Sequence, residues 1–218
     1  MDKAAIILSG GMDSTTLLYD IKRHNEPIAL IFDYNQRHKK EIDCAHKTCI
    51  KLNVPYKIIN LNVLNDIAPS VLTRNTLEVP EGNYNDENMK QTVVPNRNMV
   101  MLSLAASYCM SDGIKDLFYG AHAGDHDIYP DCRESFINSM RETLHLSDWN
   151  LCQLWAPYMN MNKGDIAKRG KELGVDYSLT WTCYKGKEKA CGKCGSCTER
   201  LEAFEKAKMI DPIEYEGT

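Results

Sequence analysis

The chain has 218 residues, 43% of them hydrophobic and 26% charged, and a net charge of −4. This length and composition are ordinary for a globular α/β domain with a small appendage. No apolar run approaches the roughly 20 residues that a membrane helix needs, and a dedicated nucleic-acid-binding domain would carry a basic surplus. We therefore expect a cytoplasmic protein that neither associates with membranes nor binds nucleic acid stably.

Short apolar runs alternate with helical segments along the chain, which predicts a doubly wound, mainly parallel sheet with right-handed crossovers. The predicted strands are residues 4–8, 28–32, 56–61 and 116–120, with a fifth inside 151–158. The predicted helices are residues 15–25, 41–52, 99–111, 133–146, 163–174 with Asn162 as N-cap, and 198–209. Residues 69–94 break this rhythm and are interpreted as an active-site lid or a disordered segment.

A glycine-containing loop, Ser9-Gly10-Gly11-Met12-Asp13-Ser14, joins the first strand to the first helix. Glycines allow a sharp turn, and the helix start offers unpaired N–H groups to phosphate oxygens. Asp13 would repel an anion unless a cation such as Mg²⁺ lay between them. A purely structural turn is the alternative, but the full pattern favours phosphate binding. The Walker A pattern is absent.

Four of the nine cysteines have the spacing C-x₇-C-x₂-C-x₂-C, namely Cys183, Cys191, Cys194 and Cys197. The odd total and this clustering favour a metal over a disulfide framework. Four thiolates suit structural tetrahedral Zn²⁺, with an iron–sulfur cluster or plain buried cysteines as alternatives. The other five cysteines are interpreted as packing residues; Cys132 as a nucleophile is the weaker reading because no activating histidine is assured.

Two segments are unusually polar: one ends the irregular segment and opens a helix, and the other follows the fourth predicted strand, at the sheet edge where ligands bind in open α/β folds. They are residues 94–98 (VPNRN) and 120–133 (GAHAGDHDIYPDCR). His122, Asp125, His126 and Asp127 could form a metal cluster, although turn residues and substrate hydrogen-bonders are the better reading. Residues 35–40 (NQRHKK) are either a solvated helix start or part of the nucleotide site.

The strings SGGMDSTTLL, F-x-Y-x-Q-R-H, LTRN, VPNRN, YPDCR, LTWTCY and CGKCGSC occur in this order over nearly the whole chain. Together they resemble the 7-cyano-7-deazaguanine synthase (QueC) family of PP-loop ATP pyrophosphatases. Many members have VPGRN where this chain has Asn96, and a different string where it has GAHAGDH.

The resemblance implies the adenine nucleotide alpha hydrolase-like fold and a carbon–nitrogen ligase of queuosine biosynthesis. Such an enzyme adenylates 7-carboxy-7-deazaguanine with ATP and Mg²⁺, lets free ammonia form the amide, and dehydrates the amide to the nitrile. It also implies a homodimer. ATP would bind at residues 8–18, that is Leu8, Ser9, Gly10, Gly11, Met12, Asp13, Ser14, Thr15, Thr16, Leu17 and Leu18. The expected catalytic residues are Asp13, Lys163, Arg97 and Arg133, and the expected substrate contacts are Asp125, Asp131 and Arg133.

We expect two domains: an ATP-binding catalytic domain over residues 1–178 and a four-cysteine zinc module with a helix over residues 179–218. One alternative function is another PP-loop enzyme that modifies tRNA, a thiolase or lysidine-type ligase, which the negative charge disfavours. The other is a nucleotide-sensing zinc-ribbon module without turnover.

Overall fold

A parallel five-stranded sheet forms the centre of the molecule in the computed structural model, which describes residues 1–73, 79, 81, 87–122, 129–185 and 187–217. The strand order is β3-β2-β1-β4-β5, so β1 lies in the middle and is hydrogen-bonded on both edges. Neighbouring strands run parallel throughout, as in the pairing of Ile6 with Ala29 on one side and with Phe118 on the other. The strands are β1 (Asp2–Ile7), β2 (Asn25–Asp33), β3 (Tyr56–Asn60), β4 (Asp116–Phe118) and β5 (Gln153–Trp155).

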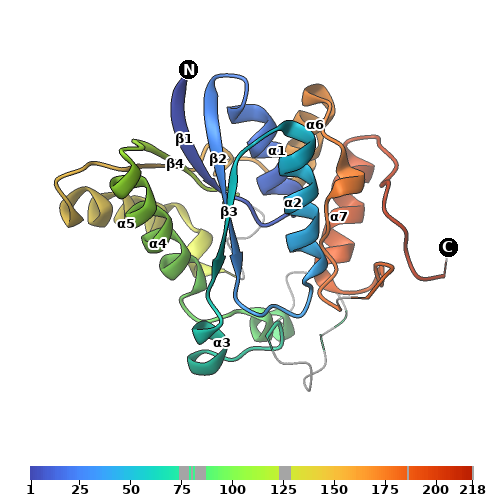
Figure 1. The fold of residues 1–218 in the computed structure, drawn as a ribbon. Helices are drawn as coiled ribbons and strands as arrows, with labels where there is room; N and C mark the ends of the chain where they lie inside the picture. The colour runs from blue at the N-terminus through green and yellow to red at the C-terminus, as the bar shows by residue number, and fades with distance from the viewer. Residues whose placement is uncertain (74–78, 80, 82–86, 123–128, 186, 218) are drawn as a thin grey trace.

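Helices cover both faces of the sheet (Figure 1). One face carries α1 (Met12–Ile21), α2 (Lys40–Leu52), α6 (Lys163–Leu173) and, outside α6, α7 (Gly195–Lys206). The other face carries α4 (Arg97–Asp112) and α5 (Glu134–Ser147). Shorter pieces are α3 (Val63–Ile67) and the 3₁₀ turns Glu87–Thr92, Pro130–Cys132 and Tyr177–Leu179. The predicted doubly wound fold is confirmed.

Successive residues of the central strands point into opposite layers of the core. Ile6 and Ile31 pack with α1 and α6, whereas Ile7 and Leu30 pack with α4 and α5. This is the two-residue period of a strand that is buried on both faces. The continuous apolar run that marked β1 in the sequence is thereby explained.

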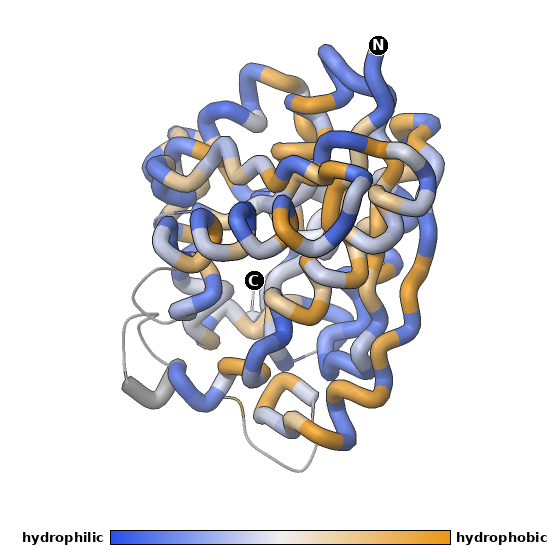
Figure 2. The backbone as a smooth tube through the Cα atoms, turned by 90° about the vertical axis from the view of Figure 1, so that its left-hand side faces the viewer, coloured by the Kyte–Doolittle hydropathy of each residue, from blue (hydrophilic) through white to orange (hydrophobic). Residues whose placement is uncertain are grey.

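The helices are amphipathic. In Figure 2, hydrophilic and hydrophobic residues alternate in short runs along each of them, as expected where one side packs on a sheet and the other meets water. None of the helices in the described part of the chain is long and apolar enough to cross a membrane.

Several element boundaries differ from the sequence-based expectation by two to four residues, among them the end of the first helix and the start of the last. The first helix ends at Ile21 rather than near residue 25, because Asn25 already pairs with Asp2 in the sheet. The last helix begins at Gly195 rather than at residue 198, so that Cys197 lies within its first turn. Of the irregular segment 69–94, residues 74–78, 80 and 82–86 lie outside the described residues, and its lid role stays a prediction.

The C-terminal segment packs directly on the rest of the chain. Phe204 and Ala203 of α7 lie against Ala167 of α6 and Met12 of α1. The guanidinium of Arg200 is fully buried, pairs with Asp211 at 2.7 Å and donates to the Tyr177 carbonyl oxygen at 3.2 Å. The predicted division at residues 178/179 remains a prediction, and the two parts share these contacts.

Candidate active site and metal centre

The loop at residues 9–14 follows β1 at its carboxyl end and lines a pocket. Gly10 has φ = +86°, a left-handed value that glycine adopts without strain. A Cβ there would lie 2.0 Å from the carbonyl oxygen of Glu41 and 2.9 Å from the amide nitrogen of Ala45. Glycine is therefore required at this position by both conformation and space. The loop is also tied to the C-terminal segment, because the Trp181 amide donates to the Gly10 carbonyl oxygen at 3.0 Å.

The two serines of this loop hold its shape. Ser14 Oγ accepts a hydrogen bond from the Ser9 amide at 3.2 Å and lies 2.9 Å from Ser9 Oγ. Gly11 donates its amide to Ser9 Oγ at 3.2 Å. Ser9 is exposed toward the pocket, and the first turn of α1 carries the unpaired N–H groups that bind phosphate in many proteins.

Asp13 is the electrostatic centre of the pocket. Its Oδ2 lies 3.6 Å from Lys163 Nζ and 3.5 Å from His122 Nε2. Burial raises the pKa of this carboxyl, but the charge of Lys163 and the contact with His122 lower it more, so the net pKa lies well below its usual range. Asp13 Oδ1 is buried and has no hydrogen-bond partner among the described residues. An ionised carboxylate with a spare oxygen beside a phosphate loop is a fit ligand for Mg²⁺.

Lys163 reaches the pocket from the first residue of α6. Asn162 caps this helix by accepting from the Asp165 amide at 3.1 Å, and Asp165 Oδ2 accepts from the Asn162 amide at 3.2 Å. The two bonds form a capping box. The Lys163 ammonium lies 2.5 Å from Glu199 Oε2 on α7, a contact that the sequence did not suggest.

Arg97 enters the pocket from the start of α4. Its Nη1 donates to Tyr34 Oη at 3.1 Å, and its guanidinium lies 5.5 Å from the Tyr34 ring centre. The preceding Asn96 has φ = +59°, the left-handed conformation that glycine and asparagine tolerate best. This explains how Asn96 can stand where many family members have glycine. Burial raises the pKa of Tyr34 to about 12, so its hydroxyl is neutral at physiological pH.

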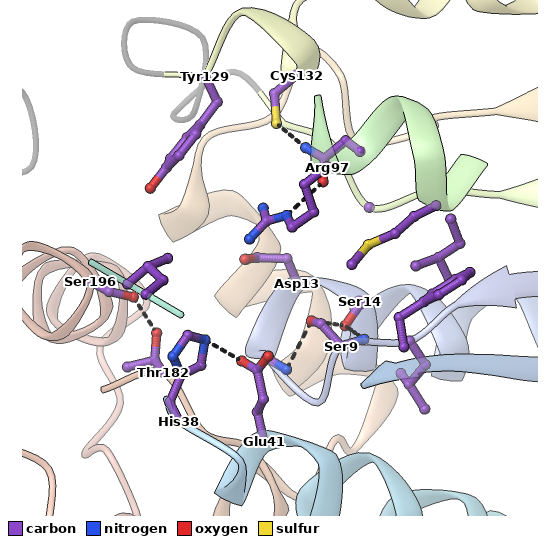
Figure 3. Close-up of a pocket in the computed structure, with 18 of the residues that line it drawn as sticks. Ser9, Asp13, Ser14, His38, Glu41, Arg97, Tyr129, Cys132, Thr182 and Ser196 are labelled. Atoms are coloured by element: carbon purple, nitrogen blue, oxygen red, sulfur yellow. Dashed lines mark hydrogen bonds and ion pairs between the residues drawn. The ribbon is translucent and has the colours of Figure 1, made fainter. Parts of the chain in front are cut away.

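Part of the 35–40 segment belongs to the pocket rather than to a solvated helix start. His38 is buried and its Nε2 lies 3.3 Å from Glu41 Oε2. Gln36, also buried, donates to the other oxygen of Glu41 at 3.3 Å. His38 and Glu41 line the same pocket as Thr182 and Ser196 of the C-terminal segment, and Thr182 lies beside His38 in Figure 3. Glu41, Thr182 and Ser196 had no role in the sequence-based interpretation, because each looks like an ordinary polar residue of a helix or loop.

The structure brings together some of the expected residues and separates others. Asp13, Arg97 and Lys163 line one pocket with Leu8, Ser9, Gly11 and Ser14. The remaining members of the expected nucleotide segment lie at the back of the loop or in the core, with Leu17 and Leu18 fully buried. Among the described residues, these members do not line the pocket and instead support the loop from behind.

The expected substrate residues are more scattered. Asp131 accepts from the Asn98 amide at 3.3 Å, at the start of α4. Arg133 precedes α5, is exposed and is not among the described residues that line the pocket. Asp125 lies outside the described residues, as do His126 and Asp127. The substrate roles of Asp125, Asp131 and Arg133, and the catalytic role of Arg133, stay predictions.

The four clustered cysteines converge at the C-terminal end. Their Sγ atoms all lie within 4.8 Å of one another, and all four residues are buried. Cys191 Sγ and Cys197 Sγ are 3.9 Å apart, and bonds of about 2.3 Å to one tetrahedral ion would separate two sulfurs by about 3.8 Å. Backbone amides of Cys194 and Lys193 point at Cys191 Sγ from 3.3 and 3.4 Å, which stabilises a thiolate.

No other such group of three or more His, Cys, Asp or Glu occurs among the described residues. The alternative cluster of His122 with Asp125, His126 and Asp127 is not tested by this search, because the last three lie outside the described residues. Cys44, Cys49, Cys109 and Cys152 are buried packing residues, and Cys132 is buried at the pocket wall.

A phosphate loop without a Walker lysine, set between β1 and α1 of a parallel sheet, defines an α/β enzyme of the PP-loop class. Comparison of the sequence with family models identifies the family within this class. It belongs to the QueC family, since the family model described as queuosine biosynthesis protein QueC matches residues 3–208.

Curated relatives agree along almost the full length. A 7-cyano-7-deazaguanine synthase of Methanoregula boonei is 65% identical over 215 residues, which are 98% of this chain and 99% of the relative. One of Caldicellulosiruptor bescii is 59% identical and covers 98% of this chain and 97% of its own. The family resemblance of the sequence motifs is thus confirmed.

Solved structures with little sequence similarity share the fold. The U34-tRNA thiolase NcsA from Methanococcus maripaludis, solved with its [4Fe-4S] cluster, superimposes with a TM-score of 0.53 at 16% identity, over 94% of this chain and 64% of the thiolase. The NMN synthetase from Francisella tularensis gives a TM-score of 0.51 at 13% identity, over 94% and 87% of the two chains.

Proposed function

We propose that this chain is an ATP-dependent carbon–nitrogen ligase that converts 7-carboxy-7-deazaguanine and ammonia to 7-cyano-7-deazaguanine. The near full-length identity to synthases of that name supports the product. The observation that carries the ATP-dependent mechanism is the pairing, in one pocket, of the residue 9–14 loop with an ionised Asp13 and the cations Lys163 and Arg97.

The first step is the formation of an acyl adenylate. A substrate carboxylate oxygen attacks the α-phosphorus of ATP, and the bond to the β-phosphate oxygen breaks to release pyrophosphate. The amides at the start of α1 and the ammonium of Lys163 stabilise the charge that develops on the phosphates. Mg²⁺, when bound, would neutralise phosphate charge, and Asp13 is the residue that would hold it.

Ammonia then displaces AMP. The nitrogen forms a bond to the carboxyl carbon, a proton leaves the nitrogen, and the carbon–oxygen bond to AMP breaks to give the amide. A second ATP activates the amide oxygen in the same way with release of pyrophosphate, and loss of AMP and of both N–H protons gives the nitrile. Arg97, at the start of α4, lines the same pocket as Asp13 (Figure 3), and its guanidinium is proposed to bind the anionic end of the substrate.

The four-cysteine site is proposed to hold structural Zn²⁺. The 3.9 Å separation of Cys191 Sγ and Cys197 Sγ supports a single tetrahedral ion, since several iron atoms between the thiolates would hold the sulfurs farther apart. Because four protein ligands complete the coordination, the metal leaves no position for substrate. Metal analysis of purified protein, with iron and acid-labile sulfide measured alongside zinc, tests this assignment.

The test of the activity is a reaction with purified zinc-loaded protein, ATP, Mg²⁺, an ammonium salt and 7-carboxy-7-deazaguanine. We expect pyrophosphate and AMP to form only with the small base, and the nitrile to be detected by mass spectrometry. Release of pyrophosphate with tRNA and not with the base would instead identify a tRNA-modifying enzyme. Nucleotide binding without any turnover would identify a sensor.

The proposal includes a cytoplasmic homodimer that acts on small molecules without stable nucleic-acid binding, as the family resemblance implies. Light scattering coupled to size-exclusion chromatography measures the mass of the particle, and a gel-shift experiment with tRNA measures the binding. A 24.8 kDa particle would contradict the dimer.

A further inference from the structure

Lys163 stands between two carboxylates that come from different parts of the chain. Asp13 lies at the start of α1, while Glu199 lies on α7, two residues after the metal-cluster residue Cys197. The ammonium is 2.5 Å from Glu199 Oε2 and 3.6 Å from Asp13 Oδ2. All three side chains are at most 21% exposed, so solvent screens these charges only partly. The Lys163 ammonium is therefore closer to Glu199, which lies outside the residue 9–14 loop, than to Asp13, which belongs to it.

The difference between the two distances has a chemical consequence. An ammonium in direct contact with Asp13 would occupy the carboxylate oxygens that a divalent cation needs, and the two cations would repel each other. Drawn toward Glu199, the ammonium still compensates the charge of Asp13 from a distance but leaves Asp13 Oδ1 without a partner among the described residues.

We propose that Glu199 is a positioning residue that holds the Lys163 ammonium away from Asp13, so that Asp13 stays open to the magnesium–nucleotide complex. The inference rests on the proposed ATP chemistry and adds a residue to it. The cysteine-bearing helix α7 thereby contributes to the active site as well as to the metal centre, together with Ser196, which lines the same pocket.

The test compares equilibrium binding of Mn²⁺, used as a paramagnetic substitute for Mg²⁺, with α,β-methylene-ATP present so that no turnover occurs. Electron paramagnetic resonance gives the free Mn²⁺ in zinc-loaded wild type and variants. We expect Glu199→Gln to weaken Mn²⁺ binding about tenfold, since Lys163 then pairs with Asp13. Glu202→Gln, an exposed change on the same helix, should leave it unchanged.

A double-mutant comparison separates positioning from general damage. In the Lys163→Met background, the further change Glu199→Gln should alter Mn²⁺ binding less than twofold, because the competing ammonium is gone. In turnover, Glu199→Gln should raise the Mg²⁺ concentration needed for half-maximal rate more than it lowers kcat. Zinc content and melting temperature of the variant should match wild type.

Three outcomes would overturn the inference, and they can be told apart. If Asp13→Asn weakens Mn²⁺ binding and Glu199→Gln does not, the positioning role is wrong while the role of Asp13 stands. If neither variant affects binding, the proposed metal role of Asp13 fails and the inference fails with it. An equal loss in Glu199→Gln with and without Lys163 would also contradict positioning through that ammonium.

Discussion

At the scale of single residues, the pocket is a balance of a few charges rather than a surface of one sign. Asp13 carries the negative charge at the phosphate loop, with Lys163 and His122 on either side of it. Arg97 faces the same space from α4. A carboxylate beside a phosphate site raises the energy of the bound anion unless a cation intervenes. Its presence there is therefore informative about the chemistry.

Replacing Asp13 tests that interpretation directly. We expect Asp13→Ala to abolish pyrophosphate release, a loss of at least about a hundredfold, because the phosphates would lose the divalent cation that the carboxylate is proposed to hold. Zinc content should not change, since the cysteines lie elsewhere. Pyrophosphate release and metal content are measured on the same preparation. Near-normal turnover would refute the role of this carboxylate.

At the scale of elements, helix starts place the functional groups. The phosphate loop opens α1, Arg97 opens α4, and Lys163 opens α6. Only α6 has a capping box, formed by Asn162 and Asp165, among these three described helix starts. Because this capping box fixes the backbone at the start of α6, it also fixes the backbone position of Lys163, the first residue of the helix.

Removing the cap should therefore affect both stability and rate. We expect Asn162→Ala to lower the free energy of unfolding by about 1 kcal/mol and to lower kcat, as Lys163 loses a fixed backbone. Asn162→Ser, which can still cap, should recover most of both. Asn150→Ala, in an exposed loop, serves as control. Urea titrations and steady-state kinetics supply the measurements; full activity in a destabilised Asn162→Ala would separate the cap from catalysis.

The pairing of α1 with α6 depends on pH through Asp20. Burial raises the pKa of Asp20, but hydrogen bonds and charge from Arg169, at 2.6 Å, lower it more, so the pKa is below the ordinary 3.8. The stabilisation is complete above 3.8, the pKa of the unfolded chain, and is lost as the pH falls through the lower folded value. We expect Asp20→Asn to cost about 1 kcal/mol at neutral pH and progressively less below that value.

Chemical denaturation of wild type and Asp20→Asn over a pH series measures this dependence. A destabilisation that stays constant down to acid pH would mean that packing of the new amide, rather than the lost ion pair, is responsible. Glu26→Gln, in the exposed part of β2, offers a charge-matched control that should show neither effect.

Sequence patterns predicted these elements well where the cause is local. The apolar runs predicted the strands, and Asn162 and Gly174 predicted both ends of α6. The end of α1 was misplaced because residues 22–25 have no glycine or proline, and the pairing of Asn25 with Asp2 is a tertiary effect. The start of α7 was misplaced because glycine disfavours helices, whereas here Cys194 fixes the turn before Gly195.

At the scale of the whole molecule, the C-terminal segment packs against the sheet and helices that carry the residue 9–14 loop. The Trp181 amide binds the phosphate loop, and the buried Arg200 joins Asp211 to the Tyr177 carbonyl. Contacts of this kind connect residues that are far apart in sequence, and no periodicity or spacing encodes them. The site was therefore predictable as a loop and a set of cysteines, but Glu199, Glu41 and Thr182 were not.

The metal centre should consequently stabilise more than its own loop. Structural zinc contributes on the order of 10–16 kcal/mol in small peptides, comparable with the roughly 5–15 kcal/mol of a whole domain. We expect chelation, or Cys194→Ala, to unfold at least the C-terminal third. Cys49→Ala, at a buried packing cysteine outside the cluster, should retain the metal. Calorimetry and circular dichroism report the result; unchanged thermal stability after complete chelation would contradict it.

The hydrogen bond from Trp181 to Gly10 also bears on how the protein is made. Ser196, which lines the same pocket as the residue 9–14 loop, is translated more than 180 residues after that loop. A nascent chain can assemble β1, α1 and β2 early, since domains form progressively during synthesis. The proposed adenylation would therefore require α7 and the cysteines around it to be in place. Under that proposal, translation products that lack α7 would be unable to consume ATP at this site, and binding of the proposed zinc ion would be a step in the maturation of the enzyme.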